Sequence, residues 1–512
     1  MLLRFYFGED GATVSGDGFA FDNFEIRPGC AWTGGVDETW HTAGNWDCGH
    51  VPGADEIAMI PWFFGDPVPY PVISTNASVS AVRADGTLTL AGGNLTTRYI
   101  YEYDVINIAE GNEVILTGSG NAWEVTWETQ AEWTNSNNGL VRFSGPGVQR
   151  IVHDYWTWID ESHFLPGERA QFYNLVIENG AQVQSAGNLQ VVNDLTVNQG
   201  GSLEMGEFGP EVNHTLTNNG TLRQGKTLGA VSYDAAFFDT GGYGGLKLNP
   251  SGWSLGATTV QIRGNQDCTS LPDETVKRCF NITPSTSPGD PGVMLTFYFA
   301  ASEIPVGQTC DSMQAYHWNG DAWDVLTLDI NYDGDGRACT VEPYSVRVTG
   351  AAGFSPFVLS NNAPQGHPTA VTLARFEATP QSGAIRVTWE TAQELENLGF
   401  NLYRGENVAG PWQQLNAALI PSQAPGAVFG AVYEWLDTEV QAGLTYYYLL
   451  EEVDIHGRST FHGPVSVVAT DPAAVTLERF VARSPVCWWF TGIMGLFTLA
   501  GMSRARRRSW NG

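Results

Sequence analysis

The segments NLVIENGAQV (residues 174–183), DLTVNQGGSL (194–203) and TLTNNGTL (215–222) share one pattern. Each begins with a short run in which apolar and polar residues alternate, and each continues into a turn rich in Asn and Gly. Leu175, Leu195 and Leu216 occupy equivalent places, 20 and 21 residues apart. A strand-and-turn unit of this period is typical of a parallel β-helix, in which each coil buries its apolar face on the next. The repeats therefore predict a β-solenoid, with a meander of hairpins as the alternative.

The stretch before the repeats is rich in tryptophan. Trp32, Trp40 and Trp46 precede the run VPGADEIAMI, which begins at Val51. This arrangement resembles the openings found before β-solenoids in bacterial surface proteins, which implies that residues 30–63 form a cap on the exposed first coil. The alternative is that the three rings stack on sugars.

One aromatic and acidic segment interrupts the repeats. In DYWTWID, Asp154, Trp156, Trp158 and Asp160 alternate, so all four would point to one face of a strand. Two rings flanked by two carboxylates suit a sugar, and we predict a candidate glycan-binding site here. The alternative is that both rings fill a gap in the core. Some parallel β-helices cleave polysaccharides with carboxylates along one face, and Asp154, Asp160 and Glu161 are the best candidates for that chemistry.

Past the repeats, runs such as VMLTFYFA and YSVRVTG, separated by turns, predict a β-sandwich. Its loop DINYDGDG places oxygen ligands at alternate positions, as calcium-binding loops do. The candidate ligands are Asp329, Asn331, Asp333 and Asp335. Thr340 stands where such a loop has its Glu, so a solvated acidic hairpin is the alternative. Calcium is the one cofactor that the sequence suggests.

The region 372–470 resembles a fibronectin type III module. The resemblance rests on Trp389 in GAIRVTWET, on the following NLYR, and on the run GLTYYYLL. It implies a two-sheet sandwich in which Tyr446 or Tyr448 forms the tyrosine corner. At the other end of the chain, LRFYFG and DGFAFDNFEI, within residues 1–29, resemble the last strands of a MAM-like jelly roll. That resemblance implies that the chain is the C-terminal part of a longer protein.

Six of the seven cysteines form three sequence-local pairs, which predicts disulfides in an exported protein. Zinc binding is the alternative, and the sequence favours it less because it has no CxxC motif and no His at ligand spacing. The predicted pairs are Cys30–Cys48, Cys268–Cys279 and Cys310–Cys339, and Cys487 stands alone.

The end of the chain predicts a membrane anchor. Residues 486–502 carry no charge and are long enough for a short transmembrane helix. The flanking aromatic and basic residues favour a basic cytoplasmic tail with the bulk of the chain outside, and resemble bacterial cell-surface sorting signals. The anchoring residues would be Trp488, Trp489, Arg504, Arg506, Arg507 and Arg508.

Charge and the absence of catalytic motifs limit the classes of function that this chain can have. A formal net charge of −30 excludes nucleic acid as a partner, and the sequence lacks G-x-S-x-G, HExxH and S-x-x-K motifs. We therefore expect an all-β, multi-domain, non-catalytic adhesion or structural protein of the bacterial cell surface that meets glycans or other surface proteins. The alternatives are the stalk of a larger secreted enzyme and a polysaccharide-active β-helix. The predicted order is truncated sandwich 1–29, cap 30–63, solenoid 64–230, sandwich 231–362, linker 363–371, fibronectin type III-like module 372–470, spacer 471–485, transmembrane helix 486–502 and cytoplasmic tail 503–512.

Overall fold

A computed structural model describes residues 29–470, apart from 64–67, 103, 127–137, 155–168, 186, 355, 367, 369–370, 382, 395–396, 425–429 and 456. In this part of the chain nearly all regular structure is β-strand. The helical elements among these residues are three short 3-10 turns, η1 (Ala43–Asn45), η2 (Ala301–Glu303) and η3 (Cys310–Ser312). The alternation of β-branched and aromatic residues with Gly and Asn turns accounts for this all-β structure.

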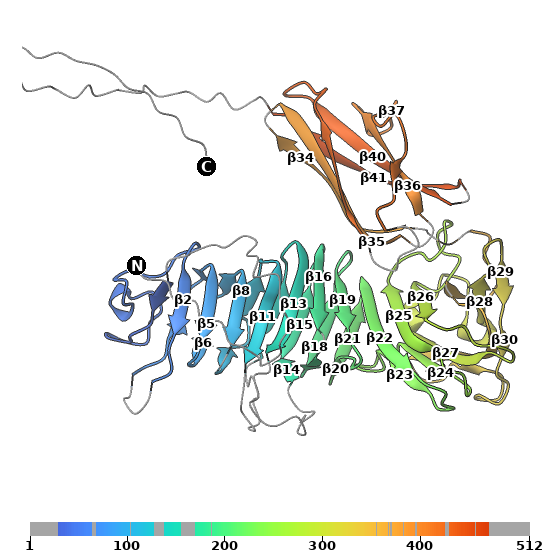
Figure 1. Cartoon of the computed structure of the whole chain (residues 1–512), viewed down its shortest axis with the longest axis horizontal. Coiled ribbons are helices and arrows are strands. Elements are labelled where there is room, and N and C mark those ends of the chain that lie inside the picture. Colours follow the sequence, from blue (N-terminus) through green and yellow to red (C-terminus); the bar gives the residue numbers. More distant parts are fainter. Residues whose placement is uncertain are drawn as a thin grey trace, which may run out of the picture.

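One 14-stranded sheet runs along the molecule (Figure 1). Its strands pair in parallel from β1 to β22, where antiparallel pairing with β25 begins. In spatial order they are β1 (Gly29–Ala31), β2 (Ile57–Ile60), β5 (Ala81–Ala84), β8 (Tyr99–Glu102), β11 (Gly120–Thr126), β13 (Gly147–Asp154), β16 (Ala181–Ser185), β19 (Ser202–Met205), β22 (Thr221–Leu228), β25 (Gly256–Gly264), β26 (Arg278–Pro284), β33 (Phe357–Ser360), β28 (Gln314–Trp318) and β29 (Trp323–Val325).

Three further parallel sheets accompany its parallel part. The seven-stranded sheet contains β21 (Thr215–Asn218), β18 (Asp194–Val197), β15 (Asn174–Ile177), β12 (Leu140–Phe143), β10 (Glu113–Leu116), β7 (Leu95–Thr97) and β4 (Ala77–Ser78). The two three-stranded sheets contain β3 (Val72–Ile73), β6 (Leu88–Leu90) and β9 (Ile106–Ile108), and β14 (Arg169–Phe172), β17 (Asn188–Val191) and β20 (Glu211–Val212). Successive repeats therefore contribute neighbouring strands to the same sheets.

The register of these strands follows the sequence repeat. Leu175 pairs with Leu195, and Leu195 with Leu216, in adjacent parallel strands. All three side chains are buried, whereas the residues next to them in the strands, such as Val176 and Thr196, are half-buried. The turns that follow place Gly180 and Gly200 at φ +81° and +77°, a left-handed conformation that favours glycine.

The antiparallel end of the 14-stranded sheet is covered by a six-stranded sheet. That sheet contains β23 (Ala235–Phe237), β24 (Leu246–Asn249), β27 (Val293–Phe299), β32 (Tyr344–Ala351), β30 (Thr327–Leu328) and β31 (Arg337–Ala338). Phe297 of this sheet packs edge-on against Phe280 of β26, with ring centroids 5.0 Å apart. One continuous hydrophobic core extends from Cys30 to Leu359, so the parallel and antiparallel parts form one body. We call this body, from Gly29 to Ser360, the β-body.

The first turn of the β-body is closed by aromatic rings. Trp46 packs edge-on between Trp32 and Trp40, with centroid distances of 5.1 and 4.8 Å. All three side chains are at most 3% exposed, which leaves no ring face available for a sugar.

The C-terminal module is a separate two-sheet sandwich with its own core. One sheet contains β34 (Val371–Gln381), β35 (Ala384–Glu394) and β39 (Val432–Asp437). The other contains β37 (Gln413–Gln414), β36 (Asn397–Gly405), β40 (Thr445–Asp454), β41 (Ser459–Val468) and β38 (Ile420–Pro421). The hydroxyl of Tyr446 accepts the backbone N–H of Gln441 at 3.0 Å, so Tyr446 makes the tyrosine corner, and Tyr448 instead donates to Asp437.

The predicted fold class is wrong on two points. The sheets are not the solenoid that the repeats predict, because the 14-stranded sheet continues from β22 into antiparallel strands and shares one core with them. Leu228 is paired with Gly256, so the sheet is unbroken at the predicted boundary near residue 230. The second point is the transmembrane helix: within the described residues, no helix is long and apolar enough to cross a membrane.

The predicted location is corrected on the same finding. A cell-surface protein anchored by its C-terminal helix needs a membrane-spanning helix, and the part of the chain that the structure describes contains none. Residues 486–502, with Trp488 and Trp489, and the arginines Arg504, Arg506, Arg507 and Arg508 lie outside the described residues.

The pH dependence of stability provides a test of the parallel part. Glu102 of β8 accepts the indole N–H of Trp123 at 2.8 Å, and burial raises the pKa of its carboxyl to about 7 from an ordinary 4.5. The folded state therefore holds this proton more tightly than the unfolded state. Its contribution to stability is complete below about pH 4.5 and is lost as the pH rises through about 7.

We expect the free energy of unfolding of Glu102→Gln to rise relative to that of the wild type as the pH goes from acidic to neutral, because the variant has no carboxyl group to lose a proton. The expected rise is about 1–2 kcal/mol, since part of the Glu102 side chain remains in solvent. Urea unfolding at several pH values measures this difference. Glu124→Gln on the neighbouring strand β11 is the control, because it removes the same charge. A stability difference between Glu102→Gln and the wild type that does not change with pH would contradict the assignment.

Candidate functional site

A cavity of about 550 Å³ lies between the β-body and the C-terminal module. Figure 1 shows the module on the flank of the β-body. One wall of the cavity comes from the outward face of β16, β19, β22 and β25, and the other from β34, β35 and the start of β39. The volume falls within the range of small-molecule binding sites.

The β-body wall is a row of polar side chains in register. Gln184, Glu204, Arg223 and Gln261 are successive Cα partners across four strands of the 14-stranded sheet. Gln184 donates to Glu204 at 2.9 Å, and Arg223 pairs with the other oxygen of Glu204 at 3.2 Å. The alternation of side chains along each strand explains this row, because the apolar neighbours point into the core.

The wall that the module contributes contains one acidic side chain and residues of β34, β35 and β39. Glu390 of β35 accepts a hydrogen bond from Gln182 of β16, which joins the two walls. Burial raises the pKa of Glu390 above its ordinary value, and Arg375 partly opposes this shift. Of the other charged residues that line the cavity, Arg223 and Glu204 form an ion pair with each other.

Two polar atoms of the β-body wall are buried without a hydrogen-bond partner among the described residues. They are Nε of Arg223, a donor, and Oε1 of Gln261, an acceptor. The two residues are direct cross-strand partners, and Gln261 is 1% exposed. Buried polar groups in proteins are normally satisfied, so this adjacent donor and acceptor indicate a place for a small polar group.

Buried charges hold the module on the β-body. Arg263 of β25 is 3% exposed, and burial lowers the pKa of its guanidinium to about 10. The charge of Glu452 in the module partly opposes this shift. His462 hydrogen-bonds to Glu452 at 2.6 Å. At the end of the β-body, the Arg458 guanidinium lies 5.6 Å from the centroid of the Trp318 ring. Two of these contacts, Arg263 with Glu452 and Arg458 with Trp318, join the module to the β-body, whereas His462 and Glu452 both belong to the module.

The predicted glycan-binding segment is mostly outside the described residues. Trp156, Trp158 and Asp160 belong to the undescribed stretch 155–168, as does Glu161. Asp154 is the last residue of β13. The glycan-binding site at this segment therefore stays a prediction.

In the acidic loop, two of the three carboxylates lie beside arginines of the protein itself. Asp329 lies 3.4 Å from Nε of Arg347, and Asp335 lies 3.3 Å from a guanidinium nitrogen of Arg337. The backbone N–H of Asn331 donates a hydrogen bond to the carboxylate of Asp329 at 3.1 Å. Asp333 is at φ +48°. Two of the four candidate ligands are thus engaged by arginines, and calcium at this loop stays a prediction.

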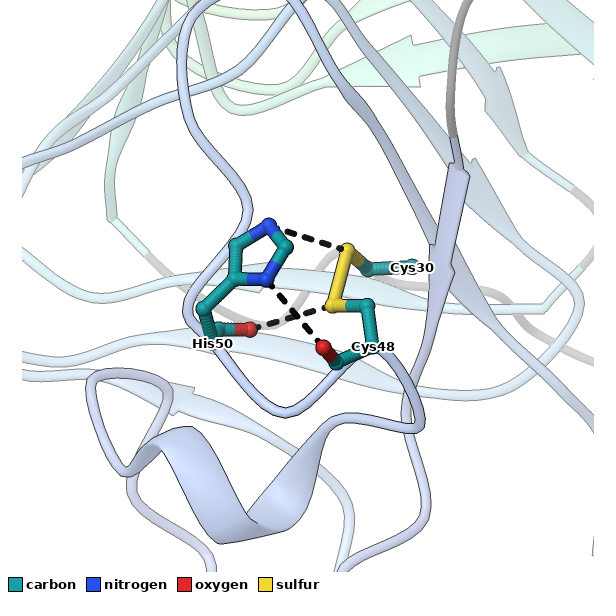
Figure 2. A group of neighbouring side chains, drawn as sticks. All are labelled: Cys30, Cys48 and His50. Carbon is teal, nitrogen blue, oxygen red and sulfur yellow. Dashed lines mark hydrogen bonds between the residues drawn. A yellow bond between two sulfur atoms is a disulfide. The ribbon is translucent and has the colours of Figure 1, made fainter. Parts of the chain in front are cut away.

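The structure contains three disulfides. They join Cys30 to Cys48, Cys268 to Cys279, and Cys310 to Cys339, as the local pairing of cysteines predicts. Cys487 lies outside the described residues. Figure 2 shows that the first disulfide has His50 beside it, with Nε2 of the ring 3.9 Å from the sulfur of Cys30. The hydrogen bond to Glu56 raises the pKa of His50 above its ordinary value.

The sequence did not reveal the interface cavity. The segment AQVQS at 181–185 shows outward-facing glutamines, which is the one available signal. The cavity depends on a module that begins almost 200 residues later, and such a long-range contact has no local pattern.

Comparisons with known proteins leave the family open. No protein-family model matches the chain, and no curated protein matches it. Among solved structures, an Fn3-like protein from Clostridium thermocellum is 20% identical over 20% of this chain and 97% of its own, with a TM-score of 0.16. A beta-1,2-glucanase from Parabacteroides distasonis is 12% identical over 48% of this chain and 38% of its own, with a TM-score of 0.14. Likenesses this low support no conclusion about function.

Proposed function

We propose that this chain is an extracellular, non-catalytic binding protein whose ligand is a neutral, hydroxyl-rich molecule such as a glycan. The three disulfides support an extracellular location, because such bonds persist in oxidising compartments. The binding site is the cavity between the β-body and the module.

The observation that carries the proposal is the unpartnered pair Arg223 Nε and Gln261 Oε1. A hydroxyl group can accept a hydrogen bond from the first atom and can donate one to the second. A carboxylate or phosphate can only accept, so it would leave Gln261 unsatisfied. The surrounding amides of Gln182 and Gln184, which also donate and accept, suit further hydroxyls.

The test is binding of the intact chain to a glycan array, followed by calorimetry on any glycan that binds. Gln261→Leu keeps the size of the side chain and removes its hydrogen-bonding groups. We expect this variant to weaken binding about 10-fold or more, because a ligand hydroxyl would lose its acceptor.

Gln190→Leu is the matched control, since Gln190 lies on β17 in a different sheet and does not line the cavity. It should bind as the wild type does. Equal binding by Gln261→Leu and the wild type would remove the cavity from the proposal.

A rigid structural spacer is the second candidate. It is favoured by the 14-stranded sheet, which continues through the whole β-body over a single core. An intact chain that binds no glycan while its module stays docked would support this second function.

A further inference from the structure

We propose that the Cys30–Cys48 pair is a redox-gated zinc site, which binds Zn²⁺ through Cys30, Cys48 and His50 once the disulfide is reduced. Among the described residues, these three form a group of potential metal ligands whose donor atoms all lie within 4.8 Å of one another. The site is independent of the cavity, because none of the three residues lines it.

The spacing of the ligand atoms fits tetrahedral zinc. Zinc lies about 2.3 Å from sulfur and about 2.0 Å from imidazole nitrogen, so sulfur and nitrogen ligands are about 3.5 Å apart. Nε2 of His50 is 3.9 Å from the sulfur of Cys30 before any adjustment (Figure 2). The two sulfurs must separate to about 3.8 Å, which follows from the loss of the bond between them.

The histidine is already oriented for a metal. Nδ1 of His50 lies 3.2 Å from the carbonyl oxygen of Cys48, so Nδ1 carries the proton and donates it there. Nε2 faces Glu56 at 2.9 Å and must be protonated to make that contact. Zinc would replace this proton. A backbone or carboxylate acceptor on the second ring nitrogen is the usual support for a zinc-bound histidine.

Glu56 stands next to the proposed ion. Its other oxygen accepts the backbone N–H of Gly53 at 2.9 Å, which holds the carboxylate in place. It is the nearest candidate for a fourth ligand. The His50 side chain is 55% exposed and Cys48 is also exposed, whereas Cys30 is 1% exposed, so a dithiol from solvent would attack the sulfur of Cys48.

The chemistry balances in two steps. A dithiol reductant gives two electrons and two protons to the Cys30–Cys48 bond, which yields two thiols, and the reductant becomes a disulfide. Zinc then displaces one proton from each thiol and the Nε2 proton of His50. Three protons are released for each ion bound when His50 starts protonated.

The experiment uses the full chain in a Cys487→Ser background, so that the tail supplies no ligand. The protein is reduced with a dithiol, the dithiol is removed anaerobically, and Co²⁺ or Zn²⁺ is added. We expect one ion for each chain, with the thiolate-to-cobalt charge-transfer band of tetrahedral Co²⁺. We expect zinc also to restore the near-ultraviolet circular dichroism of the neighbouring Trp32, Trp40 and Trp46 if reduction weakens it.

His50→Ala should weaken zinc binding more than ~100-fold, because even the loss of an outer partner of a ligand costs about 10–100-fold. His41→Ala is the control, as His41 is exposed in the same region and outside the ligand group. Three results would each overturn the proposal: no zinc bound by the reduced chain, binding by His50→Ala equal to the wild type, or binding that depends on Cys268 and Cys279 instead.

Discussion

Replacing Arg263 with alanine is expected to release the C-terminal module from the β-body. Arg263 and Glu452 are 3% and 1% exposed, and they attract each other across the interface. Arg263→Ala removes the cation that the β-body offers to Glu452 and leaves this buried carboxylate with His462 of its own module. Breaking a buried ion pair costs up to about 3–5 kcal/mol. The module can avoid this cost by leaving the β-body, because water then solvates Glu452.

Small-angle scattering measures this release as an increase in the radius of gyration, without loss of β structure in circular dichroism. Arg386→Ala is the matched control. Arg386 lies in the same module but pairs with Glu434 at an exposed site, where an ion pair contributes about 0–1 kcal/mol. A compact Arg263→Ala protein with wild-type stability would show that the buried pair does not hold the module.

The β composition and the aligned leucines could be read from the sequence because they depend on local patterns. Leu175, Leu195 and Leu216 stand one repeat apart, and neighbouring strands place them side by side. The disulfides were also predictable, since each joins cysteines separated by fewer than 30 residues in the chain.

The solenoid prediction was wrong because a local sequence repeat does not show where the parallel pairing of strands ends. The repeats describe how one strand pairs with the next, but they do not say that β22 also pairs with β25 in the opposite direction. Gln224 and Val260, which pair there, are 36 residues apart and belong to different sequence patterns. The transmembrane helix was inferred from the uncharged stretch 486–502 and the aromatic and basic residues that flank it, and the described residues contain no helix of that kind.

The interface cavity escaped prediction for a related reason. Gln261 looks like an ordinary outward-facing residue of a strand, and Glu390 like an ordinary acid of a sandwich. Their burial comes from the docking of two separately folded units, which neither local sequence encodes. The buried Arg263 belongs to the same class, because its partner Glu452 is almost 190 residues away.

Replacing Trp389 with alanine is expected to unfold the module and to leave the β-body folded. Trp389 is 1% exposed, stacks on Tyr433 with the rings 2° from parallel, and meets Phe400 edge-on. Truncating a buried tryptophan costs about 3–5 kcal/mol, which is a large part of the stability of a domain of this size. The module has a core of its own, separate from that of the β-body, so the loss should be confined to it.

Differential scanning calorimetry should show the module transition lowered or absent in Trp389→Ala, with the β-body transition close to its wild-type temperature. Phe461→Ala is the control, because Phe461 is on the same module but 54% exposed. A single transition that shifts as a whole would mean that the two units unfold together.

Trp389→Ala and Arg263→Ala together separate docking from folding, since the first removes the folded module and the second only detaches it. If the ligand lies between the units, both variants lose binding. Binding that survives in both places the ligand on the β-body alone.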